Sequence, residues 1–120
     1  MRSIIVVKRE GKIISDKSEW IGIEDINFTE PERIKGEIRT VIHTDEGEFL
    51  YCTTNDQVIE LISQEHGFMI TDRGRMANLK KEIDIDYDNR NILYRKCMKY
   101  ITIAASKVNS LKQLLKKLSK

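Results

Sequence analysis

The sequence predicts a mainly β domain with two helical additions. Short runs of β-branched and apolar residues, separated by turn-forming residues, dominate the first fifty positions. The segment Ile83–Asp88 alternates strictly between a large apolar residue and aspartate, which is typical of a half-buried strand. Helical periodicity occurs in only two stretches, and strands and helices do not alternate as they would around a parallel sheet. Because 120 residues is the size of one domain, we expect residues 1–120 to form a single, mostly antiparallel β domain.

Turn residues bound the extended runs of the first half. Gly11 lies in the first turn, Glu24 and Asp25 interrupt the second run, and Pro31 is expected to end it, leaving 32–36 as a polar loop. Asp45–Glu48 resembles a hairpin turn. The strands expected here are Ile4–Lys8, Trp20–Phe28, Arg39–Thr44 and Phe49–Thr53.

The middle of the chain changes to helical periodicity and then returns to strands. A helix is expected over Asn55–Glu65, with Thr54 or Asn55 as its cap and His66-Gly67 at its end. A charged loop around Gly74 is expected over residues 72–75, and Met76–Leu79 is extended or turning. The remaining strands are expected at Phe68–Thr71, Ile83–Tyr87, Ile92–Tyr94 and Met98–Ile103.

A second helix is expected over Ala105–Leu118. Val108, Leu111, Leu115 and Leu118 form one apolar stripe, and lysines fill much of the remaining surface. We expect the stripe to pack on the β core. The alternative is a membrane-surface anchor, since basic amphipathic helices bind anionic lipids, although this helix has no aromatic residue.

Composition favours a globular, non-secreted protein. Hydrophobic residues make up 40% and charged residues 33% of the chain, a mixture that suits a packed core. The longest apolar run, Ile4–Val7, is too short for a membrane span or the core of a secretory signal. We therefore expect a cytoplasmic location and no membrane partner. Cys52 and Cys97 are then expected to be buried free thiols, because disulfides are unusual in a reducing compartment.

Charge is distributed unevenly between the two parts of the chain. Residues 1–72 hold 8 Lys and Arg against 15 Asp and Glu, a net charge of −7, whereas residues 73–120 hold 13 against 4, a net charge of +9. Such a split suggests a polyanionic partner for the C-terminal part, although the same charges could pair with the acidic part instead.

No catalytic or metal-binding motif is present, so we expect neither an enzyme nor a cofactor. Asp84, Asp86 and Asp88 share one strand face and could bind a cation, but such a row more often forms the solvent-exposed face of a strand. His43 and His66 have no histidine or cysteine at ligand spacing and are expected to be structural. Phosphate-binding glycine loops, nucleophile elbows and zinc motifs are lacking.

One segment, F68-M-I-T-D-R-G-R-M-A-N-L-K-K81, is similar to the signature phrase F-x-R-V-H-R-S-Y-x-V-N-L-x-K of LytTR DNA-binding domains. The matches in register are Phe68, Arg73, Asn78, Leu79 and Lys81. Residues 24–30 resemble the family's E-D-I-x-Y-I-E strand, and residues 41–48 resemble its V-x-I-x-T-x-D-G-E hairpin. Residues 92–94, 101–103 and 111–115 are similar to its closing elements, so the resemblance covers nearly the whole chain.

The resemblance implies an elongated arrangement of three small antiparallel sheets, with one short internal helix and a C-terminal helix. It also implies a bacterial transcription regulator of the response-regulator type that inserts loops into the grooves of double-stranded DNA. The chain departs from the family phrase at Ile70, Asp72, Gly74 and Arg75. Near the C-terminus the family shows a pattern like I-S-R-R, whereas this chain has Ile103-Ala104-Ala105-Ser106-Lys107, so the arginines are missing or shifted to Lys107. Asp72 could accept a hydrogen bond from a cytosine amino group or form an ion pair that positions Arg73 or Arg75.

Three loops are therefore expected to contact DNA: Glu32–Gly36, Thr71–Arg75 and Ala104–Lys107. For Arg73 the alternative is a salt bridge to the acidic part of the chain, and for Asn78 it is a buried side chain that bonds the backbone of a turn. A homodimer on direct-repeat sites is a further expectation. The alternative function is a protein-interaction or regulatory module on the same scaffold. The predicted DNA-binding residues are Arg33, Lys35, Thr71, Arg73, Arg75, Asn78, Lys80, Lys81, Ser106 and Lys107.

Overall fold

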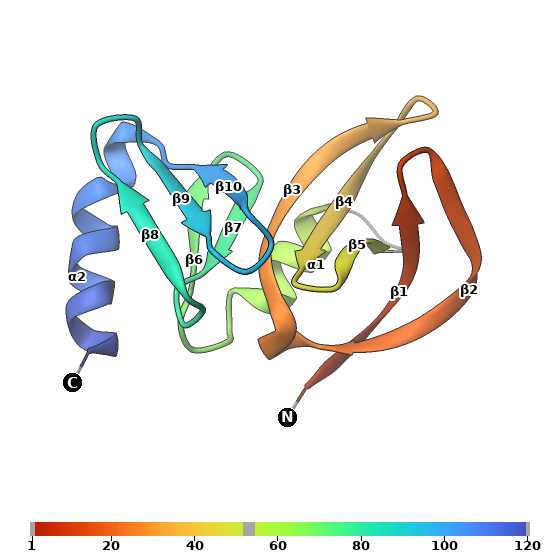
Figure 1. Ribbon diagram of the computed structural model, residues 1–120, viewed down its shortest axis with the longest axis horizontal. Coiled ribbons are helices and arrows are strands. Elements are labelled where there is room, and N and C mark those ends of the chain that lie inside the picture. Colours follow the sequence, from red (N-terminus) through yellow and green to blue (C-terminus); the bar gives the residue numbers. More distant parts are fainter. Residues whose placement is uncertain (1, 52–54, 120) are drawn as a thin grey trace.

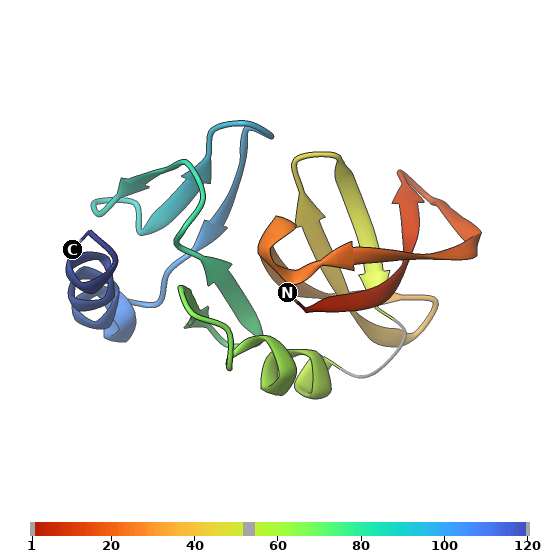
Figure 2. The same ribbon diagram turned by 90° about the horizontal axis from the view of Figure 1, so that it is seen from below.

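The computed structural model describes residues 2–51 and 55–119, and within them the chain is mainly β, as predicted. The strands are β1 (Ser3–Glu10), β2 (Ile13–Gly22), β3 (Ile26–Ile34), β4 (Glu37–Thr44), β5 (Gly47–Tyr51), β6 (Phe68–Asp72), β7 (Arg75–Asn78), β8 (Ile83–Asp86), β9 (Asn91–Tyr94) and β10 (Lys99–Thr102). The helices are α1 (Asn55–Ile62) and α2 (Val108–Leu118), with 3₁₀ turns η1 (Ile23–Asp25) and η2 (Ala105–Lys107). Figures 1 and 2 show an elongated molecule with the β1–β2 hairpin at one end and α2 at the other.

The strands of the described residues form two antiparallel sheets. The larger has the order β2-β1-β5-β4-β3-β7-β6, and the smaller has the order β10-β9-β8. The expectation of three small sheets was therefore wrong in number, although the fold class is confirmed. The physical reason is a short ladder: Phe28 of β3 pairs with Ala77 of β7, and Thr29 pairs with Met76, which joins the β6–β7 hairpin to the N-terminal strands.

The expectation that Pro31 ends its strand was also wrong. β3 continues to Ile34, and its pairing with β4 includes Pro31 opposite Thr40. The ladder with β7 ends at Thr29, so β3 has a strand partner on only one side beyond that point. A proline, which lacks an N–H, is tolerated where one side of a strand is unpaired. The predicted loop 32–36 is therefore a tight two-residue turn at Lys35-Gly36, in which both residues have positive φ angles (+51° and +84°).

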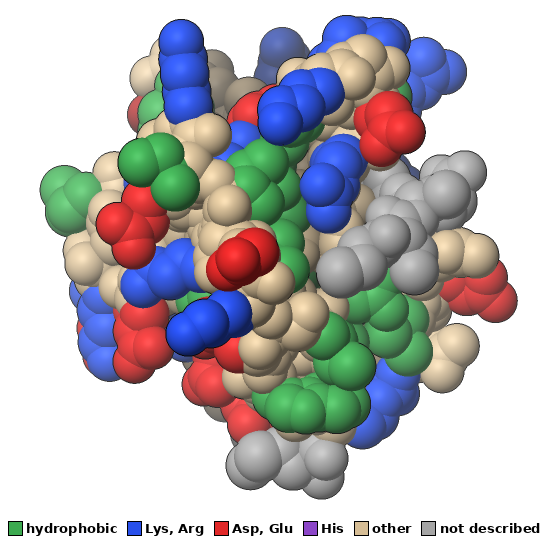
Figure 3. Space-filling model, turned by 90° about the vertical axis from the view of Figure 1, so that its right-hand side faces the viewer, with side chains coloured by type: hydrophobic (Ala, Val, Ile, Leu, Met, Phe, Trp, Pro, Cys, Tyr) green, Lys and Arg blue, Asp and Glu red, His purple; other side chains and the backbone are tan. Residues whose placement is uncertain are grey.

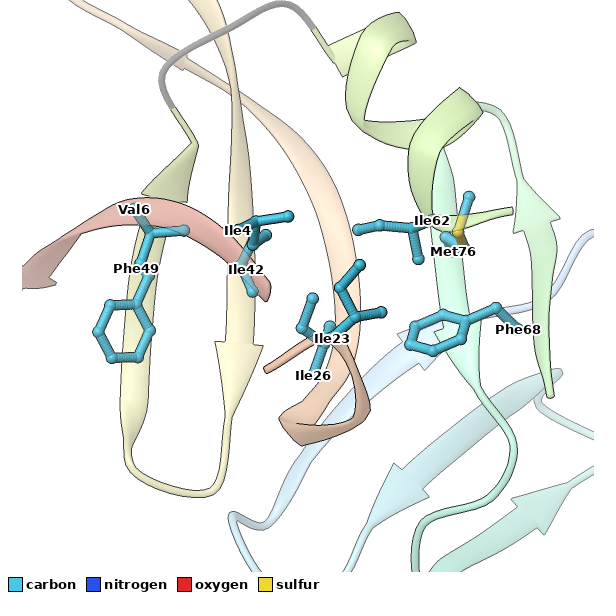
Figure 4. Packing of buried hydrophobic residues seen from close by; sticks show 9 residues of the cluster. All are labelled: Ile4, Val6, Ile23, Ile26, Ile42, Phe49, Ile62, Phe68 and Met76. Carbon is cyan, nitrogen blue, oxygen red and sulfur yellow. The ribbon is translucent and has the colours of Figure 1, made fainter. Parts of the chain in front are cut away.

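Two clusters of buried hydrophobic side chains hold the fold together. Figure 4 shows the first, where the N-terminal strands of the larger sheet meet α1 and the β6–β7 hairpin; its members are Ile4, Val6, Ile23, Ile26, Ile42, Phe49, Ile62, Phe68 and Met76. The second joins the smaller sheet to β3, β7 and α2. Its members are Phe28, Ala77, Leu79, Ile92, Tyr94, Ile101, Ile103 and Leu111.

The apolar stripe of α2 packs against this second cluster, as predicted. Leu111 is fully buried, and Val108, Leu115 and Leu118 are partly buried around it. The stripe is therefore covered by the protein itself, which contradicts the membrane-surface interpretation of this helix. No helix in the described part of the chain is long and apolar enough to cross a bilayer.

Candidate nucleic-acid interface

The three predicted DNA-binding loops lie along one long side of the molecule. In Figure 1 the β3–β4 turn, the β6–β7 turn and the segment from β10 to η2 are all at the upper edge, and the β8–β9 turn lies beside them. The chain termini point to the opposite side. The fold therefore gathers loops that are far apart in the sequence.

The β6–β7 turn is built from Asp72 to Arg75. Asp72 pairs with Arg75 across the hairpin, and Gly74 adopts a φ of +69°, which favours glycine. The Asp72 Oδ1 accepts a hydrogen bond from the backbone N–H of Arg73 at 2.8 Å. These contacts hold a compact turn from which the Arg73 side chain projects into solvent.

The segment after β10 docks directly on this turn. The backbone N–H of Ala104 donates to the Thr71 carbonyl oxygen at 2.7 Å, and the Thr102 hydroxyl lies 3.4 Å from Asp72 Oδ2. Asp72 is therefore half-buried against Thr102. Among the described residues it forms no ion pair with an arginine, so the predicted role of an ion pair that positions Arg73 or Arg75 is contradicted. Its carboxylate therefore lies against Thr102 of β10. In η2, further along the chain, Ser106 is exposed and Lys107 is half-buried.

Arg73 and Arg75 differ in their surroundings. Arg73 is exposed and has no ion pair within the described part of the chain, so the predicted alternative of a salt bridge to the acidic part is not formed there. Arg75 is half-buried, and its positive charge helps to lower the pKa of Glu30 in β3. The pKa of Glu30 is lowered mainly by its hydrogen bond with His43, against the opposing effect of burial, with Arg75 contributing further.

At the β3–β4 turn, Lys35 and Arg33 are both exposed. The Arg33 Nη1 donates to the Gly36 carbonyl oxygen at 3.1 Å, which braces the turn and leaves Lys35 at its tip. This hairpin extends beyond the body of the sheet in Figure 1.

Four of the predicted residues lie away from this loop side or are buried. Thr71 is fully buried, and only its backbone carbonyl takes part in docking Ala104. Asn78 is buried, and its Nδ2 donates to the Ile26 carbonyl oxygen at 2.9 Å while its Oδ1 accepts from the Lys80 N–H at 3.0 Å. Asn78 therefore has the role that the sequence left open as the alternative to DNA contact, that of a buried side chain bonding the backbone. Lys80 and Lys81 follow the far end of β7, and Lys81 lies 3.5 Å from Asp45.

Arg90, which was not among the predicted DNA-binding residues, is exposed in the β8–β9 turn with a φ of +52°. Its carbonyl oxygen accepts the N–H of Ile103 at 2.8 Å, so this turn is tied to the segment that docks on Thr71. The signal available in the sequence is that Arg90 opens the last 31 residues, which contain no Asp or Glu.

The other candidate groups occupy structural positions. His43 is buried, stacks on Phe28 with ring centroids 4.2 Å apart, and lies 2.7 Å from Glu30 and 3.6 Å from Glu48. Asp84 lies 3.8 Å from Arg95, and Asp86 accepts hydrogen bonds from Asn89, which lower the pKa of Asp86.

Residues 2–51 and 55–119 contain no group of three or more His, Cys, Asp or Glu that could hold a metal ion. Cys97 is a half-buried free thiol, and Cys52 lies outside the described residues.

Comparison with known proteins identifies the fold. No protein-family model matches the chain, and no curated protein matches it. Among solved structures, the chain is similar to the LytTr DNA-binding domain of a Bacillus cereus protein described as a methyl-accepting/DNA response regulator. The TM-score is 0.66 at 15% sequence identity, and the match covers 96% of this chain and 98% of the other.

The chain has a LytTR-type fold. The predicted resemblance is thereby confirmed at the level of the fold. Because the coverage is nearly complete in both directions, the LytTR-type unit accounts for both sheets and for α2.

Proposed function

We propose that this LytTR-type chain binds double-stranded DNA through the loops of its upper side in Figure 1. The observation that carries the proposal is the β6–β7 turn, where exposed Arg73 projects from a turn fixed by Gly74 and docked against residues 102–104. The solved structure with the same fold is a DNA-binding domain, which supports the same function here.

The chemistry of the loop residues suits two kinds of contact. Arg73 and Arg75 each have a planar guanidinium, which can donate two parallel hydrogen bonds to a guanine edge or to a phosphate. Lys35, Arg90 and Lys107 are cations that would neutralise phosphates and release counterions, without selecting a sequence. We therefore place sequence selectivity on the β6–β7 turn and attribute general affinity to the surrounding cations. Thr71, Asn78, Lys80 and Lys81 are left out of this interface.

Random-site selection with the purified chain tests the proposal. We expect an enriched duplex sequence and an affinity that falls steeply with salt. Replacing both Arg73→Ala and Arg75→Ala should abolish the enrichment and lower the slope of log affinity against log salt by up to about 2, since each phosphate contact contributes about 0.9.

The control is Arg95→Ala, an exposed arginine near the β9–β10 turn that leaves the loop side unchanged. It should retain the enriched sequence and the salt slope. Failure to enrich any sequence, together with equal weak binding by wild type and the double variant, would contradict the proposal. The selected sites would also show whether they occur as direct repeats for a homodimer, and reporter assays on neighbouring promoters would test transcriptional regulation.

A second candidate is the protein-interaction module, and one surface favours it. Trp20 of edge strand β2 is 68% exposed, and its cross-strand partner Ile5 is also exposed. Figure 3, which views the β1–β2 end, shows hydrophobic side chains gathered among charged ones. Exposed apolar patches with an aromatic residue are typical of protein contacts. Trp20→Ser should then abolish capture of a protein partner while leaving DNA binding unchanged.

A further inference from the structure

We propose that Glu30 of β3 is a positioning residue for DNA recognition, whose half-buried carboxylate orients the Arg75 guanidinium toward the bases. The inference rests on the proposed DNA binding and adds to it a residue that acts through Arg75 without touching DNA itself. A carboxylate close to a surface that approaches phosphates repels them, so Glu30 by itself would lower the general affinity for DNA. The arrangement of β3 and β7 gives this charge a partner in Arg75.

The first observation is the register between these two strands. Their ladder ends where Thr29 of β3 pairs with Met76 of β7. One further step in the same register places Glu30 opposite Arg75, the first residue of β7. Residues directly opposite each other in an antiparallel pair project from the same face of the sheet, and opposite charges there attract. The fold therefore places the Glu30 carboxylate beside the Arg75 side chain.

The second observation is that Glu30 is itself held in place from the neighbouring strand β4. His43 Nε2 lies 2.7 Å from Glu30 Oε2. His43 is buried and stacks on Phe28, so the group that holds the carboxylate has little freedom of its own. The hydrogen bond with His43 is the main influence that lowers the pKa of Glu30, and the charge of Arg75 adds to it. Glu30 is therefore ionised at neutral pH and fixed on the side away from Arg75.

The third observation is the direction of the Arg75 side chain. Its Nη1 lies 3.5 Å from the Arg73 carbonyl oxygen, so the guanidinium lies along the β6–β7 turn. Asp72, its partner across the hairpin, directs its carboxylate to Thr102 and to the backbone N–H of Arg73.

Glu30 therefore supplies the negative charge that Asp72 does not. Among the described residues Glu30 and Arg75 form no direct ion pair, so the attraction orients the guanidinium and leaves its N–H donors available to DNA. An arginine that is oriented before it binds loses less conformational entropy when it bonds a base. The expected effect of Glu30 is thus on base selectivity and not on general affinity.

The test compares the dissociation constant for the duplex enriched by the wild-type chain with that for a scrambled duplex of the same length and composition. The ratio of the two constants measures base reading. Glu30→Gln and Arg75→Ala should each lower this ratio about tenfold, the loss of one paired contact to a base. Glu30→Gln should not weaken binding to the scrambled duplex, because it removes a negative charge. Glu30→Asp, which keeps the charge, should restore part of the ratio.

The double variant tests whether Glu30 acts through Arg75. In the Arg75→Ala protein, Glu30→Gln should have no further effect on the ratio, because the group that it orients is absent. Urea denaturation of each variant checks that it is folded under the conditions of the titration.

The matched control is Glu37→Gln, an exposed carboxylate beside the β3–β4 turn that forms no ion pair within the described part of the chain. It should leave the ratio unchanged. Equal losses in Glu30→Gln and Glu37→Gln would overturn the inference, as would losses from Glu30→Gln and Arg75→Ala that add in the double variant. A high wild-type ratio that Glu30→Gln retains would overturn this inference alone, whereas a wild-type chain that does not distinguish the two duplexes would overturn the proposed function as well.

Discussion

Glu48 on β5 is expected to contribute strongly to stability, and its contribution should depend on pH. Its carboxylate accepts from Arg9 Nη2 at 2.9 Å and from Lys99 Nζ at 2.7 Å, and so connects β1 and β5 with the β9–β10 hairpin. Burial alone would raise the pKa of Glu48. Hydrogen bonds from Lys99 and Arg9, together with the charges of His43 and Lys99, lower the pKa from 4.5 to about 2.

The magnitude follows from this pKa. A pKa lowered from 4.5 to about 2 corresponds to about 3 kcal/mol in favour of the ionised carboxylate in the folded state. The side chain is 21% exposed, so solvent screening reduces the expected contribution to about 2 kcal/mol. Because the folded pKa is depressed, this stabilisation is present above pH 4.5 and is lost as the pH falls toward about 2.

Urea denaturation of Glu48→Gln and wild type between pH 7 and pH 2.5 measures this contribution. At pH 7 the variant should be less stable by about 2 kcal/mol, and the difference between the proteins should shrink as the pH falls below 4.5. Glu46→Gln is the control, because Glu46 is exposed in the adjacent turn and forms no ion pair within the described residues. A Glu48→Gln difference that stays constant across this pH range would refute the electrostatic account.

Three further substitutions test the packing and the proposed interface. Tyr94→Phe removes the 2.9 Å hydrogen bond from the buried hydroxyl to the Asn78 carbonyl oxygen, and should cost about 1–3 kcal/mol in urea denaturation, with an unchanged midpoint counting against it. Leu111→Ala empties a fully buried site under α2 and should cost about 2–5 kcal/mol in the same assay, whereas Gln113→Ala on the exposed face should have little effect. Asp72→Ala loosens the β6–β7 turn from Thr102, so a DNA titration should show weaker binding by about 1 kcal/mol; tighter binding would mean that the carboxylate repels DNA.

Local patterns were sufficient to predict most elements of secondary structure. The alternation over Ile83–Asp88 corresponds to β8, and the leucine stripe of the C-terminal segment corresponds to the buried face of α2. The predicted first helix ends earlier, at Ile62 and not at Glu65. The expectation that Pro31 ends its strand was wrong because the effect of a proline depends on whether a second strand lies beside β3, which no local pattern reveals.

The candidate interface was only partly predictable. The phrase that resembles the LytTR signature, and the loops that this resemblance implies, singled out Arg73, Arg75 and Lys35, which lie in turns along one side of the molecule. The same phrase suggested Asn78, whose side chain is buried in backbone hydrogen bonds, because a sequence phrase does not distinguish residues that shape a turn from residues that reach beyond it.

Periodicity, turn residues and composition within short windows predict the fold class, most of the strands and helices, and the charge asymmetry. The expected strand Trp20–Phe28 is an exception, because the structure divides it among the end of β2, η1 and the start of β3. Three features could be seen only in the folded chain: two sheets form, Asp72 faces Thr102, and Lys80 and Lys81 lie apart from Arg73. Each of these depends on contacts between segments distant in the chain, such as Ala104 with Thr71 and Asn78 with Ile26.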